Sequence, residues 1–395
     1  PLANEGDGKL ADDQSLVIIS GTPKYTNVFD TVGGRRNGEE GNNVQRVAVY
    51  NGTDDVSENY EITYRYGTLT VSPRPIKLRT ESLERVYDGT PLHALSPESA
   101  WGGHLFETVL GETGLYDLVE GHEAVNHPKT ADSKMPSITD ANANIGEDPL
   151  TPFKNALKAR IVDTDGRDMS ENYEIVGYEY GTLTVRRRPI TLVSVSGEWD
   201  YDGRKHNFED SSEYLNNYVN GQRTPFYVVK GTIVPGQILG YIDIDSEIPT
   251  ITDAGWVKNL ITATITADVN GSRMPVTQNY VIEYEYGTLT VNPRHIRVEL
   301  PDATWVYDGM MHVVGTEPDE RLEYNGVGLT KDSNRLADGH KLSVPGLSIM
   351  NAGTYINEQV VTVRDADGHP VKEGNYIIEY ADYGTITVEK RPLVI

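Results

Sequence analysis

Apolar and polar residues alternate along much of this chain with a period of two, which is typical of half-buried β-strands. In residues 59–71, Tyr60, Ile62 and Tyr64 share one face, and a second strand follows after Gly67. A turn or bulge costs little at a glycine, so we expect the break between the two strands to lie there. Similar alternation predicts further strands at residues 44–50, 76–78, 190–195, 260–265 and 360–363.

The alternating segment recurs four times. The copies read NYEITYRYGTLTV at residues 59–71, NYEIVGYEYGTLTV at 172–185, NYVIEYEYGTLTV at 279–291 and NYIIEYADYGTITV at 375–388. The glycines of the Tyr-Gly-Thr triplet are spaced by 181 − 67 = 114, 287 − 181 = 106 and 384 − 287 = 97 residues. Two other landmarks recur: Tyr-Asp-Gly begins at residues 87, 201 and 307, and an Ile-Thr-Asp-Ala or Ile-Met-Asn-Ala segment begins at 138, 251 and 349. A period of about 100 residues indicates an array of similar domains.

These landmarks divide the chain into repeats at residues 1–73, 74–187, 188–293 and 294–390, and residues 391–395 begin a fifth. The first unit has no Tyr-Asp-Gly, so we expect it to be a partial repeat. Short strands with frequent turns in units of this size predict an all-β fold of tandem Ig-like β-sandwich repeats in an elongated array. β-grasp-like units are the alternative. The single candidate helix of useful length covers residues 211–219, where Ser211 can cap the first turn.

No flexible spacer separates one repeat from the next. Residues 67–71 lead through Ser72-Pro73-Arg74-Pro75 directly into the next predicted strand at Ile76. Proline restricts its own φ and the residue before it, so neighbouring repeats of the chain should meet at restricted angles. His295 and Lys390 replace junction prolines, and the junctions that contain them are expected to be looser.

The combination of NYxIxYxYGTLTV, a Pro-Arg-Pro-Ile or Arg-Pro-Ile junction and VYDG or DYDG resembles the YDG/YGX-type (MBG-like) Ig-like tandem repeats of large bacterial cell-surface proteins and adhesins. The resemblance covers nearly the whole chain. It implies an extracellular array on the bacterial cell surface, sometimes associated with adhesion to host mucus or glycans, with the export signal and the anchor outside this fragment.

Charge and composition exclude several function classes. The chain has 35 basic and 59 acidic residues, a net charge of −24, which disfavours binding to the phosphate backbone of nucleic acid. No run of about 18 apolar residues is present, so we expect no membrane insertion in this segment. The absence of cysteine excludes disulfides, thiolate metal sites and cysteine nucleophiles.

Metal and catalytic motifs are weak. Asp163, Asp165 and Asp168 are a candidate site for weak calcium binding, but Asp-Gly pairs between strands favour hairpin turns, and an EF-hand loop needs a different spacing. His122 and His127 are five residues apart and have no third ligand near them in the sequence. Hydrolase, phosphate-binding and metalloprotease motifs are absent. We therefore expect no cofactor, no bound metal and no enzyme activity.

The aromatic residues allow two functions. Tyr60, Tyr173, Tyr280 and Tyr376 fit the tyrosine-corner position and are expected to be structural. The variable loops at residues 101–132 and 208–237 carry rings that could stack on sugars: Trp101, Phe106, Tyr214, Tyr218, Phe226 and Tyr227. The leading hypothesis is a structural stalk that projects a binding domain from the cell. The alternative is a binding module in which these loops recognise mucin glycans or a host protein.

Overall fold

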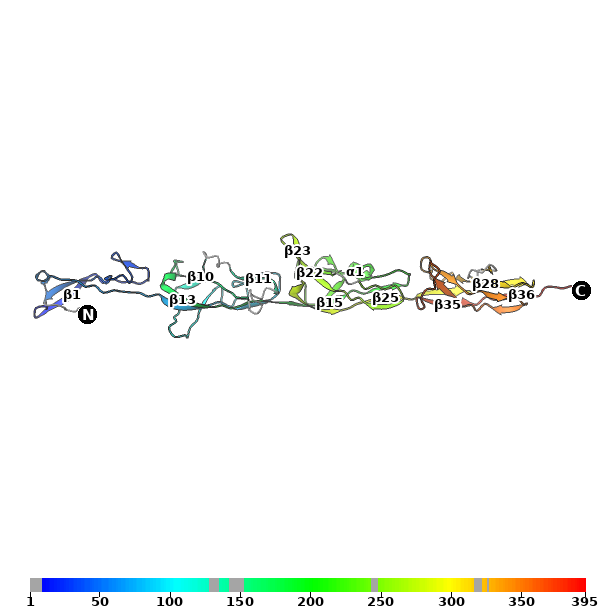
Figure 1. The fold of residues 1–395 in the computed structure, drawn as a ribbon, viewed down its shortest axis with the longest axis horizontal. Helices are drawn as coiled ribbons and strands as arrows, with labels where there is room; N and C mark the ends of the chain where they lie inside the picture. The colour runs from blue at the N-terminus through cyan, green and yellow to red at the C-terminus, as the bar shows by residue number, and fades with distance from the viewer. Residues whose placement is uncertain (1–8, 128–134, 142–152, 243–247, 316–321, 325–326) are drawn as a thin grey trace. The chain divides into compact units, whose positions relative to one another are not determined.

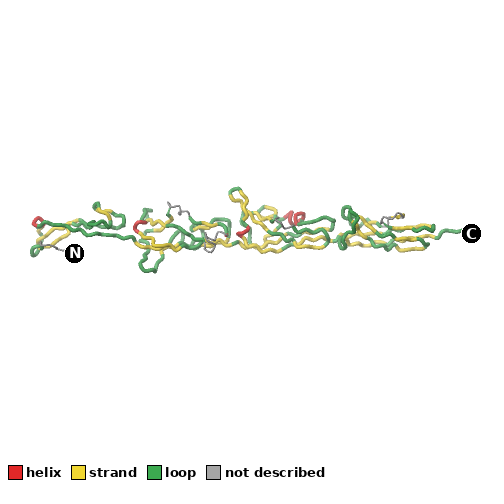
Figure 2. The backbone as a smooth tube through the Cα atoms, viewed as in Figure 1, coloured by secondary structure: helices red, strands yellow, loops and turns green. Residues whose placement is uncertain are grey.

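The computed structural model describes residues 9–127, 135–141, 153–242, 248–315, 322–324 and 327–395. Its regular structure is almost entirely strand, as Figures 1 and 2 show, which confirms the all-β prediction. That the repeats are Ig-like sandwiches, and not β-grasp-like units, stays a prediction. The chain separates into two compact units, residues 1–186 and 187–395, and this boundary lies one residue from that predicted between the second and third repeats.

The first unit contains the first two repeats. The elements of the first repeat are β1 (Gln14–Ser20), β2 (Thr31–Val32), β3 (Arg35–Arg36), β4 (Arg46–Asn51), β5 (Asp54–Asp55) and the 3-10 turn η1 (Ser57–Asn59). Those of the second repeat are β6 (Arg74–Arg79), β7 (Leu83–Val86), β8 (Leu92–His93), β9 (Glu107–Thr108), β10 (Glu123–Asn126), β11 (Ser137–Ile138), β12 (Ala159–Val162), η4 (Ser170–Asn172), β13 (Tyr173–Glu179) and β14 (Leu183–Arg186).

The second unit contains the third and fourth repeats. The elements of the third repeat are β15 (Arg188–Ser194), β16 (Gly197–Asp200), η5 (Phe208–Asp210), α1 (Ser212–Asn216), β17 (Tyr218–Val219), β18 (Gln222–Arg223), β19 (Phe226–Lys230), β20 (Ile238–Tyr241), β21 (Gly255–Lys258), β22 (Ala263–Val269), β23 (Ser272–Pro275), η6 (Thr277–Asn279), β24 (Tyr280–Glu285) and β25 (Thr288–Asn292). Those of the fourth are β26 (Arg294–Glu299), β27 (Ala303–Val306), β28 (His312–Val314), β29 (Leu322–Tyr324), β30 (Gly328–Leu329), β31 (Lys341–Ser343), β32 (Leu347–Ile349), β33 (Gly353–Ile356), β34 (Thr362–Arg364), β35 (Tyr376–Asp382) and β36 (Thr385–Glu389).

A pair of parallel ladders forms the frame of the second, third and fourth repeats. The strand that opens each repeat runs parallel to the strand that follows the Asn-Tyr pair: β6 with β13, β15 with β24 and β26 with β35. The next strand pairs in parallel with the strand after Tyr-Gly-Thr: β7 with β14, β16 with β25 and β27 with β36. The first two strands of a repeat are therefore paired with its last two.

The Tyr-Gly-Thr glycine is required where the two ladders meet, because backbone from the opening strands passes directly over it. A Cβ atom at Gly181 would lie 2.3 Å from the Glu81 carbonyl oxygen, and one at Gly384 would lie 2.2 Å from that of Leu300. Real Cβ atoms do not approach so closely, so glycine is needed for its small size.

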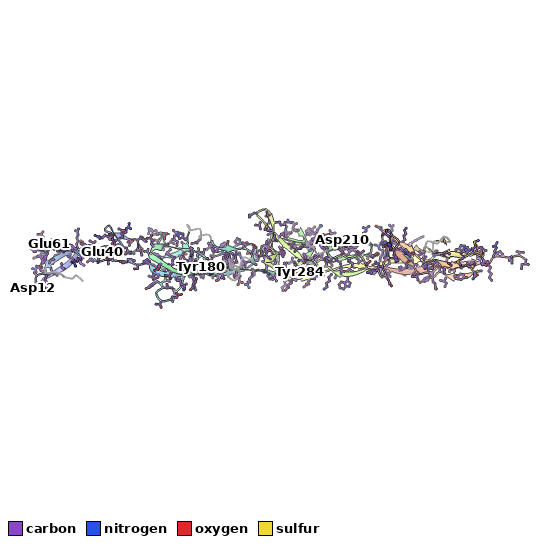
Figure 3. The ribbon with its side chains drawn as sticks, in the orientation of Figure 1. Asp12, Glu40, Glu61, Tyr180, Asp210 and Tyr284 are labelled. Carbon is purple, nitrogen blue, oxygen red and sulfur yellow. The ribbon has the colours of Figure 1, made fainter. Side chains whose placement is uncertain are left out.

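Hydrophobic cores form on the inner faces of these ladders. In the second repeat Ile76, Leu78, Leu157 and Ile161 are fully buried together. Each such side chain contributes about 1.5–3 kcal/mol on burial. The alternate polar positions of the same strands face outward, as the period of two requires. Tyr180 and Tyr284, labelled in Figure 3, are members of stacked tyrosine pairs, with ring centroids 5.3 Å and 6.0 Å from Tyr178 and Tyr286.

The first repeat departs from the prediction. Residues 60–71 form no strand, although the same motif does in the other three copies. Among the described residues of the first repeat, no strand pairs with this segment as β6 pairs with β13, and β1 pairs antiparallel with β4. Side chains hold the segment in place: Asn42 accepts from the Leu69 amide at 2.6 Å, and Asn37 accepts from the Val71 amide at 2.7 Å.

The predicted helix is present but shorter than residues 211–219. It is α1, a single turn in which the Ser211 hydroxyl accepts from the Tyr214 amide at 3.2 Å. The helix ends before Asn217, whose side chain turns inward to donate to the carbonyl oxygens of Thr224 and Phe226.

Candidate functional site

Each repeat ties the tyrosine of its Asn-Tyr pair to a loop through the hydroxyl group. The Tyr173 hydroxyl accepts from the Val119 amide at 3.1 Å and lies 2.6 Å from Nδ1 of His122. Equivalent contacts join Tyr60 to Ala11 and Gln14, Tyr280 to Val234 and Gln237, and Tyr376 to Ala337 and His340. These bonds tie the tyrosine to backbone 39 to 54 residues earlier in the chain. The tyrosine corner of an Ig-like domain bonds to backbone only a few residues upstream, so the tyrosine-corner assignment stays a prediction. Burial raises the pKa of the Tyr173 and Tyr376 hydroxyls.

The asparagine before that tyrosine reaches out of its own repeat. At the contact between the third and fourth repeats, called junction 3–4, Asn375 is 1% exposed. Its Oδ1 accepts from the Ala254 amide at 2.6 Å, and its Nδ2 donates to Oδ1 of Asp253 at 2.8 Å. Lys372 adds an exposed ion pair to Asp253 at 3.1 Å. The Asn375 amide, and then the Lys372 ammonium, hold the pKa of the Asp253 carboxyl below its ordinary value.

Aromatic packing accompanies these hydrogen bonds at junction 3–4. The ring of Tyr201, from the Tyr-Asp-Gly turn of the third repeat, meets that of Tyr376 edge to face at 5.4 Å and lies 6.0 Å from that of His340. Burial in this contact raises the pKa of the Tyr201 hydroxyl. The Arg294 guanidinium also donates from Nε to the Tyr201 carbonyl oxygen at 2.6 Å. The Tyr-Asp-Gly turn thus serves as a contact surface for the next repeat.

The contact between the first and second repeats, called junction 1–2, has the same asparagine hydrogen bonds without the aromatic packing among the described residues. The Oδ1 of Asn172 accepts from the Val28 amide at 2.7 Å, and its Nδ2 donates to Oδ1 of Asn27 at 3.0 Å. Asn27 and Val28 here take the places of Asp253 and Ala254. The same asparagine therefore forms the same pair of hydrogen bonds at both described junctions.

Sequence reasoning did not single out these junction residues, although signals for them were present. An asparagine precedes the tyrosine in all four copies of the long motif. The Ile-Thr-Asp-Ala or Ile-Met-Asn-Ala landmark also recurs with an acid or an amide before a small residue. What the sequence could not show is that the two landmarks of successive repeats meet.

The candidate calcium residues do not come together as a metal site. Asp163 accepts from the amides of Asp165 and Arg167, both at 2.9 Å, which is ordinary turn geometry. The Arg167 guanidinium lies 3.0 Å from Asp165, where it neutralises the carboxylate. Asp168 is bonded to Ser170, whose hydroxyl and amide lower the pKa of the Asp168 carboxyl.

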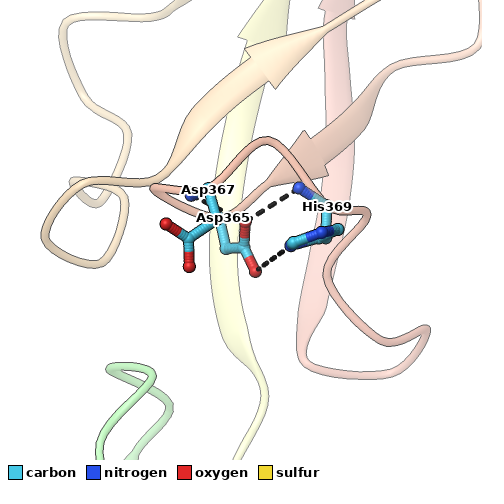
Figure 4. Close-up of side chains that lie close together, drawn as sticks. All are labelled: Asp365, Asp367 and His369. Atoms are coloured by element: carbon cyan, nitrogen blue, oxygen red, sulfur yellow. Dashed lines mark hydrogen bonds and ion pairs between the residues drawn. The ribbon is translucent and has the colours of Figure 1, made fainter.

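The equivalent turn of the fourth repeat does gather possible metal ligands. Figure 4 shows Asp365, Asp367 and His369, whose ligand atoms all lie within 4.8 Å of one another, and which form the sole cluster of this kind among the described residues. The cluster is solvent-exposed, and Asp365 already accepts from the amides of Asp367 at 3.0 Å and His369 at 2.8 Å. The hydrogen bonds of the turn therefore account for this arrangement.

The six loop aromatics separate into core and surface. Phe106 and Phe226 are buried, at 7% and 0% exposure, and cannot stack on a ligand without unfolding. Tyr218 is 54% exposed and Tyr227 is 38% exposed. The Arg223 guanidinium lies 5.8 Å from the ring centroid of Tyr214 and 5.6 Å from that of Tyr218. Trp101 is partly buried in the first unit. Of the six, only Tyr214 and Tyr218 are joined in one group on the surface.

A tryptophan and a histidine enclose the Tyr-Asp-Gly turn in two repeats, and sequence reasoning missed this pair. Trp199 stacks on His206 with ring centroids 4.6 Å apart, and Trp305 stacks on His312 at 5.0 Å. His206 bridges Asp202 at 3.0 Å and Asp210 at 2.8 Å. Burial acts to lower the pKa of His206, but these two carboxylates outweigh it, and the pKa is raised. The spacing Trp-x-Tyr-Asp-Gly-x-x-His was the available signal.

Comparison with known proteins adds no family: no protein-family model matches the chain, and no curated protein is detectably similar to it in sequence. Across the described residues, no helix has the length and apolar character needed to cross a bilayer.

Proposed function

We propose that this chain is a structural spacer, a stalk segment of a bacterial surface adhesin that holds a binding domain away from the cell. The observation that carries the proposal is the asparagine contact at junctions 1–2 and 3–4. Recurring polar residues of the repeat are used there to join one repeat to the next. In a binding or catalytic array, the recurring polar residues would instead converge on a ligand. The extracellular location rests on the resemblance to adhesin repeats.

Small-angle X-ray scattering of the whole chain tests the spacer function. A compact protein of this length has a radius of gyration of about 21 Å. If each repeat advances the chain by one strand of about 30 Å, four repeats in series give a rod of roughly 120 Å with a radius of gyration of about 35 Å. We expect the larger value at low protein concentration. A value near the compact figure would contradict the spacer function.

A second candidate function is glycan binding through the loop patch formed by Tyr214, Tyr218 and Arg223. The observation that favours it is the exposed Tyr218 ring beside the Arg223 guanidinium, since exposed rings stack on sugars and guanidinium groups bind acidic ones. A glycan array and a mucin pull-down test it with Tyr218→Ala, using Trp101→Ala as the matched loop variant. Saturable binding that Tyr218→Ala abolishes and Trp101→Ala leaves intact would favour this function over a pure spacer.

A further inference from the structure

The variable loop of the second repeat forms one wall of an open groove. The groove has a volume of about 710 Å³ and is lined by Arg79 and by residues of the segments 104–110 and 117–124. Phe106 and Ala124 line it from the core side, because they are only 7% and 3% exposed. Ligand sites in proteins commonly have volumes of about 300–1,000 Å³, so the groove is large enough to hold part of a peptide.

Two cations of β6 fix the loop that forms this wall. Arg74 donates from Nε to the Asp117 carbonyl oxygen at 2.7 Å, and its guanidinium lies 4.9 Å from the ring centroid of Tyr116. The Lys77 ammonium lies 2.6 Å from the Glu112 carboxylate. Neither Arg74 nor Lys77 is among the residues that line the groove. They therefore hold the loop in place without adding positive charge to the lining.

Carboxylates outnumber cations in the lining of the groove. It contains four carboxylates and one arginine, a formal charge of 1 − 4 = −3 when its histidines are neutral. The Arg79 guanidinium pairs with the Glu107 carboxylate at 2.5 Å. Nδ1 of His104 lies 2.8 Å from the Glu123 carboxylate. Two of the four carboxylates thus already have a partner that can carry positive charge.

The other two carboxylates, Asp117 and Glu120, have no cationic partner among the described residues. The Asp117 carboxylate accepts from a threonine hydroxyl and from a backbone amide, which are both neutral donors. Exposed apolar side chains accompany them in the lining: Val119 is 45% exposed and Leu110 is 60% exposed. The groove therefore combines unpaired negative charge with apolar surface that water covers.

We propose that this groove is a docking site for a basic segment of a partner protein, an extended peptide that carries both lysine or arginine and large apolar side chains. Its cations pair with Asp117 and Glu120, and its apolar side chains cover Leu110 and Val119. Charge complementarity favours this occupant, because the groove carries −3 and the whole chain −24, so that a basic segment is attracted and nucleic acid is repelled. The inference goes beyond the spacer function, since a spacer needs no groove.

Titration of the whole chain with synthetic peptides tests the proposal. The probe is the peptide Lys-Leu-Lys-Leu-Lys with blocked ends. Two matched peptides replace either every lysine by glutamate or every leucine by serine. We expect saturable binding of the Lys/Leu peptide by isothermal titration calorimetry at low ionic strength, and affinities at least roughly tenfold weaker for both matched peptides. Added salt should weaken the binding, because it screens the exposed charges.

Variants of the chain locate the binding site. Asp117→Asn combined with Glu120→Gln removes the two unpaired charges and keeps a side-chain acceptor at position 117, so the loop should stay folded. We expect it to weaken binding of the probe at least roughly tenfold, and Leu110→Ser to weaken it roughly threefold. Glu285→Gln combined with Glu358→Gln is the matched control, because both are exposed carboxylates outside the groove. The control should change the affinity less than about twofold.

Three results would overturn the proposal. One is the absence of saturable binding of the Lys/Leu peptide. Another is an equal loss of affinity in the groove variant and in the control variant, which would assign the binding to the overall negative charge of the chain. A third is equally tight binding of the Lys/Ser peptide, which would show that the apolar side chains of the groove take no part.

Discussion

Junctions 1–2 and 3–4 use the same asparagine contact but differ in what surrounds it. At both, an asparagine side chain accepts from a backbone amide and donates to a side-chain oxygen of the preceding repeat. Junction 3–4 adds the Tyr201 ring, while residues 1–73 contain no Tyr-Asp-Gly to supply one. Arg294 donates to the Tyr201 carbonyl oxygen across the junction, whereas Arg74 donates to Asp117 within its own repeat. The hydrogen bonds define which residues meet, and the ring adds buried apolar area.

Removing the Tyr201 ring should have the largest effect on the stability of junction 3–4. Tyr201→Ala deletes a nearly buried aromatic side chain, and such truncations cost about 3–5 kcal/mol. We expect this loss in the free energy of opening junction 3–4, measured by hydrogen exchange at Ala254. Tyr307→Ala is the matched control, because its ring is more exposed and covers no junction, so its effect should be under about 1 kcal/mol. Equal effects of the two variants would show that the ring acts only within its own repeat.

Removing the asparagine side chain that crosses each junction should have the next largest effect on junction stability. Asn375→Ala leaves the Ala254 amide without its partner and the Asp253 carboxylate with the Lys372 ammonium alone, which costs about 2 kcal/mol. Asn172→Ala at junction 1–2 should cost somewhat less, since its acceptor Asn27 is neutral and bonds to charged groups are the stronger ones. Asn59→Ala is the control, because Asn59 is exposed and, among the described residues, only its backbone amide forms a hydrogen bond, to the Val56 carbonyl oxygen, which the substitution keeps. The exchange rates of the Ala254 and Val28 amides measure the two junctions separately.

The sequence predicted the repeat and the β class because both depend on local patterns. Alternation along the segments that follow the Asn-Tyr pairs predicted the strands β13, β24 and β35. The strands predicted at residues 76–78 and 190–195 are present in β6 and β15, where Ile76 and Ile190 are buried. It wrongly predicted a strand at residues 60–71, because a strand also needs a partner, and the partner of the other three copies comes from residues about 100 positions earlier. The junction contacts were missed for the same reason: Asn375 and Ala254 are 375 − 254 = 121 residues apart.

The loop aromatics show a different limit of sequence reasoning. Phe226 and Tyr227 are adjacent and were grouped as candidate ligand contacts, but alternation along β19 buries the first and exposes the second. Short strands such as β17 and β18 carry too few residues for a period to be recognised. Which rings reach the surface is therefore decided by tertiary packing.

The contribution of His206, which supports the Tyr201 turn, to the free energy of unfolding should depend on pH. Carboxylates raise the pKa of His206 in the folded state, so its stabilisation is present below the ordinary value of 6.5 and is lost as pH rises through the raised value. His206→Gln should cost about 1 kcal/mol more at pH 5.5 than at pH 9, because the lost stacking on Trp199 is common to both. Chemical denaturation at several pH values measures this. His312→Gln is the comparison, since it leaves junction 3–4 intact. A loss that is the same at pH 5.5 and pH 9 would contradict the charged bridge.

The smallest expected effect concerns Asp253. Its pKa is lowered in the folded state, first by the Asn375 amide and then by Lys372, so the stabilisation is present above the ordinary value of 3.8 and is lost as pH falls through the lower folded value. Because the Lys372 side chain is 69% exposed and that of Asp253 is 43% exposed, the contribution should be under about 1 kcal/mol. Exchange at the Ala254 amide, corrected for its intrinsic rate, should show junction 3–4 weakening in acid, and Asp253→Asn should remove that dependence. Junction 1–2 has the neutral Asn27 in place of Asp253, so any acid dependence there should come from Asp30, which accepts from Asn27, and Asn27→Ala should remove it. The reverse substitution, Asn27→Asp, should weaken junction 1–2 at neutral pH, because the Asn27 amide now donates to Asp30 at 3.3 Å and a second carboxylate would repel it. If Asn27→Asp instead strengthened that junction, charge at this position would matter more than the neighbouring Asp30.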